Sequence, residues 1–85
     1  MFWREDYEAM RVVAGHGECG LRQFLFTCAI VTGLDAIGYK GRYCYETRAQ
    51  ALAALESWRG SADPPGAWIK YKGADGERLG PGATA

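Results

Sequence analysis

One segment constrains the fold of this chain more than any other: residues 39–58, where an alternating stretch runs directly into a helix signal. Successive side chains of a β-strand point to opposite faces of the sheet. Within residues 39–46 one face would carry the tyrosines, and the other would carry Lys40, Arg42, Cys44 and Glu46. The pattern predicts a strand whose tyrosines face a core and whose cations face solvent.

A helix is predicted to begin directly after this strand. Thr47 is followed three residues later by Gln50, which is the spacing of a capping box, where each side chain satisfies a backbone N–H at the start of a helix. Gly60 supplies a stop signal. Between them lies an apolar stripe at helical spacing, formed by Ala51, Leu52, Leu55 and Trp58.

The residues before this segment predict one helix and one strand. Apolar and aromatic residues recur at helical spacing in residues 3–14, so a helix is expected there, and the three glycines of residues 15–20 predict a loop. Residues 24–33 are apolar on both alternating faces, which is typical of a central strand, and residues 34–38 would form a hairpin connection. The helical stripe consists of Trp3, Tyr7, Met10 and Ala14.

The residues after the second helix predict a third strand and a tail. Residues 60–66 contain two prolines and read as an irregular connection, and residues 68–72 alternate again as a short strand. The order helix-strand-strand-helix-strand predicts a small α+β domain with a three-stranded, mainly antiparallel sheet and helices packed on it. The expected domain spans residues 1–73, and residues 74–85 are expected to be a flexible tail.

Bulk properties restrict the classes of protein to consider. Eighty-five residues make one small domain, and ten basic residues balance ten acidic ones, so no overall field draws the chain to nucleic acid or membrane. The N-terminal residues lack the continuous apolar core of a signal peptide, and the longest apolar run is too short to span a bilayer. Three cysteines favour free thiols in a reducing cytoplasm.

The cations of the two alternating strands form the candidate binding site. A shared register would bring five side chains to the solvent side of the sheet: Lys40, Arg42, Trp68, Lys70 and Lys72. Such a surface suits an acidic patch on a protein, or nucleic-acid phosphates with a base stacked on the indole. It equally suits an ordinary solvated sheet face. Trp68 follows a rigid Asp-Pro-Pro-Gly loop, which would present it for binding, or it could instead anchor the third strand in the core.

Metal binding and catalysis have little support in the sequence. His16, Cys19, Cys28 and Cys44 could supply four zinc ligands, but the paired Cys-x-x-Cys spacing of structural zinc sites is missing. Cys28 and Cys44 are equidistant from residue 36 and would lie opposite each other in the hairpin, as small buried side chains. No catalytic motif accompanies the single histidine. We therefore expect no metal, no cofactor and no enzymatic activity.

The run from residue 24 to residue 73 resembles a group of short proteins encoded in phages and prophages of proteobacteria. The resemblance rests on Gly-Tyr-Lys-Gly-Arg-Tyr-Cys-Tyr at residues 38–45, the helix at residues 51–58, Asp-Pro-Pro-Gly at residues 63–66 and Trp-Ile-Lys at residues 68–70. It implies no catalytic residue. Small phage proteins of this size often disarm host defence, and anti-CRISPR proteins of the type I-C class come from such prophages.

The leading expectation is therefore an anti-CRISPR-like, phage-encoded inhibitor of host defence in the bacterial cytoplasm. It would cover a surface of a host protein complex, such as a type I CRISPR surveillance complex, through an aromatic anchor and a charged rim. One alternative is a small nucleic-acid-binding module that uses the same face. A weaker alternative is a phage structural or assembly component that self-associates through the stripe of the first helix.

Overall fold

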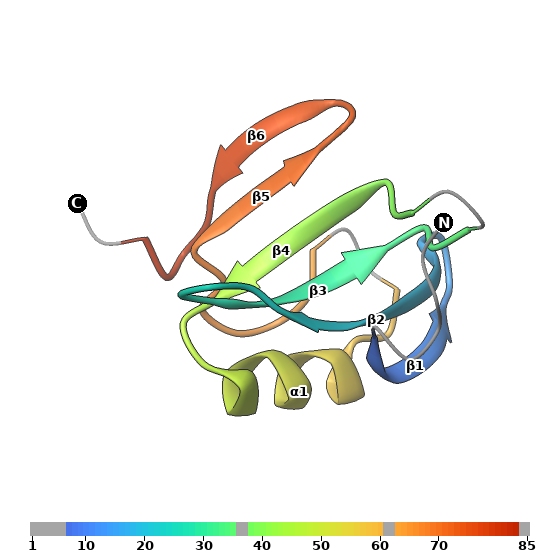
Figure 1. Cartoon of the computed structure of the whole chain (residues 1–85), viewed down its shortest axis with the longest axis horizontal. Coiled ribbons are helices and arrows are strands. Elements are labelled where there is room, and N and C mark those ends of the chain that lie inside the picture. The colour runs from blue at the N-terminus through green and yellow to red at the C-terminus, as the bar shows by residue number, and fades with distance from the viewer. Residues whose placement is uncertain (1–6, 36–37, 61–62, 84–85) are drawn as a thin grey trace.

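The computed structural model describes residues 7–35, 38–60 and 63–83, and in these residues the chain is mostly sheet (Figure 1). The elements, in chain order, are β1 (Glu8–Val13), β2 (Gly17–Gln23), β3 (Cys28–Thr32), β4 (Gly41–Tyr45), α1 (Arg48–Ser57), β5 (Lys70–Gly73) and β6 (Gly76–Leu79). The six strands form one antiparallel sheet in the order β1-β2-β3-β4-β5-β6. The predicted three-stranded sheet with two helices is therefore wrong.

The helix is the part that the sequence predicted best. Thr47 is its N-cap, and both bonds of the capping box are present: the Gln50 N–H donates to Thr47 Oγ1, and the Thr47 N–H donates to Gln50 Oε1. The helix packs against β2, β3 and β4 on one side of the sheet (Figure 1). It buries Ala51, Ala54 and Leu55 there, so the predicted stripe is close to the observed one.

The core fills the space between α1 and the sheet. Its fully buried members come from β1 to β4 and the helix, and Trp58, which directly follows the helix, is among the largest of them. On the sheet these are the side chains that point toward the helix, and they alternate with those on the opposite face. The sheet contributes Val13, Cys19, Leu21, Cys28, Ile30, Tyr43 and Tyr45.

Residues 8–13, predicted as part of a helix, form the edge strand β1 instead. Glu8 pairs with Leu21 and Arg11 with Cys19, so two residues of β1 face one residue of β2 in a β-bulge. Ala9 takes a left-handed conformation at this bulge, with φ of 52°. Because of the extra residue, Tyr7 and Met10 both lie next to Gly20 although they are three positions apart in the sequence. A spacing of three residues on one face is also typical of a helix, which explains the wrong prediction.

Residues 17–33 also differ from the prediction. Residues 17–20, expected in a loop, begin β2. The strand expected at residues 24–33 is shorter than predicted and starts only at Cys28. Its first four residues form the turn between β2 and β3, where the Phe24 N–H donates to the Thr27 carbonyl at 2.7 Å. The next five residues are β3, and all of them are buried because β3 lies at the centre of the sheet.

The register of β3 and β4 separates the two cysteines. Cys28 pairs with Tyr45 and Ala29 with Cys44, so the expected Cys28–Cys44 pair is off by one residue. A shift of one residue moves a side chain to the other face of a sheet. Cys28 therefore lies in the core, whereas Cys44 is partly exposed on the opposite face.

The segment expected to be a loose tail contributes the last strand. Residues 76–79 form β6 against β5, and the chain beyond it stays attached, because the Gly80 N–H donates to the Ile69 carbonyl and the Gly82 N–H to the Trp68 carbonyl. A Cβ atom at residue 80 would overlap the Trp68 carbonyl and indole. Glycine at residue 80 allows this close approach. The glycine content of the segment had instead predicted a flexible tail.

Candidate functional site

The face of the sheet opposite α1 carries most of the predicted binding residues, and we call it the open face. It is defined by two rows of cross-strand neighbours that alternation places on the side away from the core. The first row is Arg22, Ala29, Cys44, Lys70 and Leu79. The second row is Gly20, Val31, Arg42, Lys72 and Glu77.

Two cations face each other at the centre of this surface. Arg42 of β4 lies directly opposite Lys72 of β5. Side chains in such a pair are neighbours, and like charges placed there destabilise a sheet. The Arg42 guanidinium donates to Tyr39 Oη at 3.0 Å and stacks over the Phe24 ring at 5.0 Å. The hydrogen bond to Tyr39 raises the pKa of Arg42, so its charge is permanent.

The other cations on or beside the open face are held in different ways. Arg22 stacks over the same Phe24 ring and over Tyr7, each at 5.7 Å from the ring centroid. Lys70 forms an ion pair with Glu77 at 3.2 Å. Lys40 is exposed in the connection before β4, beyond the end of the strand. Sequence reasoning identified four of these cations but missed Arg22, because residues 21–23, the second half of β2, were assigned to no element.

Trp68 does not belong to the open face. It is 4% exposed and lies in the core, where its ring meets Tyr43 edge-on at 5.1 Å. Strand β5 begins only at Lys70, so the alternation that would have placed Trp68 beside Lys70 and Lys72 does not extend to it. The structure thus separates Trp68 from the four predicted cations and gives it the anchoring role that the sequence had left open.

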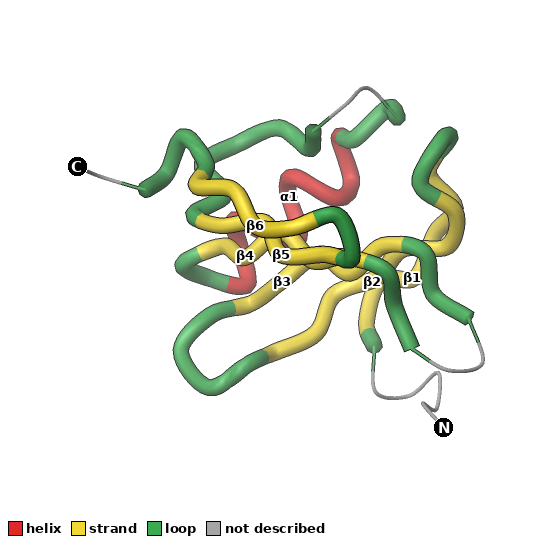
Figure 2. Tube along the Cα trace, turned by 90° about the horizontal axis from the view of Figure 1, so that it is seen from above, coloured by secondary structure: helices red, strands yellow, loops and turns green. Residues whose placement is uncertain are grey.

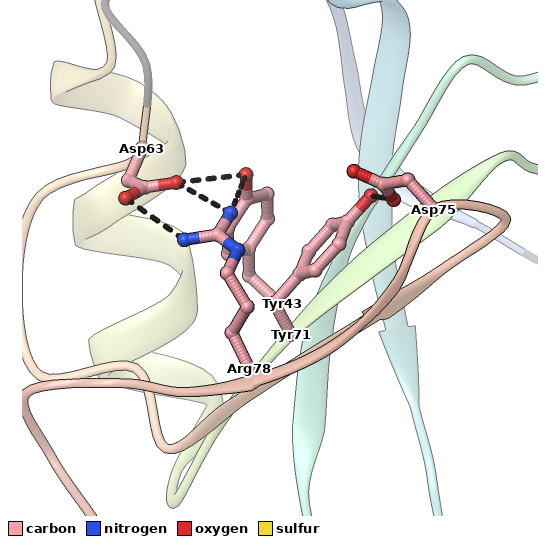
Figure 3. A network of polar contacts seen from close by, with 5 residues as sticks. All are labelled: Tyr43, Asp63, Tyr71, Asp75 and Arg78. Carbon is pink, nitrogen blue, oxygen red and sulfur yellow. Dashed lines mark hydrogen bonds and ion pairs between the residues drawn. The ribbon is translucent and has the colours of Figure 1, made fainter.

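A polar network on the helix side of the sheet joins three segments that are distant in the sequence (Figure 3). Arg78 of β6 donates through both terminal nitrogens to the Asp63 carboxylate, at 2.9 and 3.3 Å. The Tyr43 hydroxyl donates to Asp63 Oδ1 at 3.1 Å. Beside them the Tyr71 hydroxyl donates to Asp75 at 2.8 Å, and the Arg78 guanidinium lies over the Tyr71 ring at 4.8 Å.

The electrostatics of this network indicate a structural clamp. Hydrogen bonding to Arg78 lowers the pKa of Asp63, and burial followed by the bond to Asp63 raises the pKa of Tyr43 to about 12. Both groups are therefore held in their ordinary neutral-pH forms, with Asp63 ionised and Tyr43 protonated. A base or nucleophile tuned for catalysis near neutral pH would need the opposite shifts.

The clamp predicts a pH-dependent contribution to stability. The folded-state pKa of Asp63 is depressed, so its contribution is present above the unfolded pKa of about 3.9 and is lost as pH falls through the folded value. Because Arg78 and Asp63 are partly exposed, we expect Asp63→Asn to cost about 0.5–1 kcal/mol at pH 7. Urea unfolding should show that this difference becomes smaller as the pH is lowered from about 5 to about 2. A loss that stays the same across this pH range would contradict an electrostatic role.

The cysteines and the histidine do not form a reactive site. Burial raises the pKa of Cys19 to about 11 and also raises that of Cys28, so both remain thiols at neutral pH. His16 stacks on Trp58, with ring centroids 4.3 Å apart. Among the described residues there is no group of three or more His, Cys, Asp or Glu side chains that could hold a metal ion.

The chain was compared with protein families, curated proteins and solved structures. No family model, no curated protein and no solved structure matches the chain. In the part of the chain that the structure describes, no helix has the length and apolar character needed to cross a membrane.

Proposed function

We propose that this chain is a small, non-catalytic binding module that covers an acidic surface of a protein partner with its open face. The observation that carries this proposal is the Arg42–Lys72 pair. Two cations directly opposite each other are unfavourable in a sheet, and the nearest opposite charge in this row, Glu77, neighbours Lys72 alone; local conflicts of this kind are expected at functional sites. A carboxylate-bearing surface placed over the pair would turn the repulsion into attraction.

The side chains around the Arg42–Lys72 pair suit binding to the surface of a partner. The Arg42 side chain is held on Phe24 and Tyr39, which lowers the entropy lost when it is immobilised by a partner. Lys72 has no ion pair with the described residues, and Lys40 and Lys70 extend the cationic area. The setting that the phage resemblance implies, inhibition of a CRISPR surveillance complex in the host cytoplasm, is part of the same proposal.

Nucleic acid is the less favoured partner because of the aromatic side chains. The base-stacking hypothesis needed Trp68 among the cations, and Trp68 is buried on the other side of the sheet. The rings beside Arg42 are already engaged, Phe24 by two guanidinium groups and Tyr39 by a hydrogen bond. An acidic protein surface can be bound by cations alone. Binding of single-stranded nucleic acid usually gains affinity also from aromatic rings that are free to stack on bases.

The test is a pull-down of the tagged chain from a bacterial lysate, with and without nuclease. We expect a stoichiometric protein that survives nuclease, and an affinity for it at least about 30-fold weaker in the Arg42→Gln/Lys72→Gln variant. That variant should keep a thermal midpoint within a few degrees of the wild type, because the loss of the Arg42 contacts with Tyr39 and Phe24 is offset by the removal of like charges. The matched control is Arg48→Gln/Arg59→Gln, which removes two exposed charges outside the open face and should bind normally.

Two results would overturn the proposal. If the Arg42→Gln/Lys72→Gln variant binds the captured protein as tightly as the control does, the open face is not the binding surface. If the captured material is lost on nuclease treatment and its affinity falls steeply with salt, the partner is a nucleic acid.

A further inference from the structure

The large apolar side chains that stay exposed are not spread evenly over the molecule. Among the described residues there are four, between 73% and 85% exposed: Val12, Leu25, Phe26 and Leu79. Leu79 belongs to the first row of the open face, opposite Lys70. Val12 precedes Val13, which points into the core, so the Val12 side chain lies on the same side of the sheet as the open face.

The other two are in the turn between β2 and β3, which adjoins the open face. Phe24 begins this turn, and its ring lies beneath the guanidinium groups of Arg22 and Arg42. The turn projects beyond the ends of both strands, and in the view of Figure 2 it bends away from α1 (Figures 1 and 2). We call Leu25 and Phe26, each 85% exposed, the apolar tip.

Hydrogen bonds hold the turn that carries the apolar tip. The Phe24 N–H donates to the Thr27 carbonyl at 2.7 Å, and the Gln23 side-chain amide donates to the carbonyls of both residues, at 2.9 and 3.0 Å. An ordered turn loses less conformational freedom when a second surface buries its side chains. The tip therefore has a defined position beside the cations of the open face.

The exposed apolar side chains and the cations thus share one side of the sheet. Single apolar side chains on a surface are ordinary, whereas several of them beside a charged patch are typical of protein–protein interfaces. Charged groups mainly raise the rate of association and the specificity, and a few buried anchors carry most of the affinity. The Arg42–Lys72 pair without an anchor would therefore give a weak complex.

We propose that the apolar tip is the anchor of the interface formed by the open face, and that it enters an apolar cleft beside the carboxylates of the protein partner. Leu79, at the β6 edge of the same side, adds a second and smaller apolar contact. This inference rests on the function proposed above and adds to it the chemistry of the partner's surface.

The charges on this side of the sheet favour a protein over an anionic membrane as the occupant. Glu77 lies in the second row of the open face, and Glu18 pairs with Val12 on the same side. A uniformly anionic lipid surface would repel both carboxylates while it attracted the cations. A protein surface can place different charges opposite each of them.

Photo-crosslinking in a nuclease-treated bacterial lysate tests where the partner sits. The tagged full chain with Phe26→p-benzoylphenylalanine should cross-link to the same protein that the wild type captures. This cross-link should be lost when Arg42→Gln/Lys72→Gln is added, because the tip and the cations bind one surface. Glu56→p-benzoylphenylalanine, at an exposed position of α1, is the matched control and should give no cross-link to that protein.

Binding kinetics with the captured protein separate the anchor from the cations. Leu25→Ser/Phe26→Ser should dissociate at least about 30-fold faster than the wild type, with an unchanged association rate. Arg42→Gln/Lys72→Gln should instead associate more slowly and with a weaker salt dependence. Leu25→Met/Phe26→Met keeps the apolar area and should dissociate at close to the wild-type rate. Both tip positions are exposed, so these variants should keep the wild-type thermal midpoint.

The possible failures are distinguishable. If Leu25→Ser/Phe26→Ser binds like the wild type while Arg42→Gln/Lys72→Gln is weakened, the anchor is refuted and the proposed function stands. If only the serine variant is weakened, or if the wild type captures no protein, the proposed function and the anchor both fail. Binding to phosphatidylcholine–phosphatidylserine vesicles that both variants lose, without a captured protein, assigns this face to a lipid surface instead.

Discussion

Trp58→Ala is expected to leave a large part of the population unfolded at 37 °C. Trp58 is 1% exposed, and its ring meets Tyr43 edge-on at 5.8 Å and His16 at 4.3 Å. It therefore joins the end of α1 to β4 and to the turn before β2. Truncating a buried tryptophan costs about 3–5 kcal/mol, and a domain of this length has about 4–13 kcal/mol in total.

Thermal unfolding followed by far-UV circular dichroism measures this effect. Each kcal/mol lowers the midpoint of a small domain by about 4–8 °C, so the midpoint should fall by at least about 12 °C. Trp58→Phe is the control, because it keeps an aromatic ring and most of the buried area, and its midpoint should fall much less. A midpoint within a few degrees of the wild type for Trp58→Ala would mean that this residue is not part of the core.

Gly80→Ala is expected to detach the end of the chain from the core, at a cost of about 1–3 kcal/mol, which is typical of overpacking. The added methyl group would overlap the Trp68 carbonyl and its indole, and neither the backbone nor the ring can move aside easily. The bonds from Gly80 to Ile69 and from Gly82 to Trp68, at 2.8 and 2.9 Å, would then break.

Amide hydrogen exchange resolves this detachment. In Gly80→Ala the amides of residues 80 and 82 should exchange much faster than in the wild type, with smaller changes in β3. Leu79→Ala is the matched control, since Leu79 is adjacent but exposed, and its exchange pattern should stay that of the wild type. Unchanged protection at residue 82 in Gly80→Ala would show that the close packing on Trp68 is not required.

The elements that could be predicted are those whose signals are local. The capping box at Thr47 and Gln50 and the alternation of residues 41–45 each specify an element within a few residues, and α1 and β4 both form there. Four of the five predicted site residues are exposed or partly exposed, and strand alternation places three of them, Arg42, Lys70 and Lys72, on one face of the sheet.

The wrong predictions concern residues whose conformation depends on a distant partner. The bulge at Ala9 gives β1 a three-residue spacing that resembles a helix, and only its pairing with β2 reveals it as a strand. Residues 17–20 and 76–79 are rich in glycine or charge and have little strand propensity of their own. They become strands because each lies beside a neighbour that offers backbone hydrogen bonds.

By itself the sequence determined the helix, the strand at residues 41–45 and the cations of one strand face, because these follow from spacings of two to four residues. Only the tertiary structure decided the number of strands, the burial of Trp68, and the position of Lys72 opposite Arg42. The physical reason is that strand pairing and register are set by hydrogen bonds and packing between distant segments, and a slip of one residue exchanges the two faces of a strand.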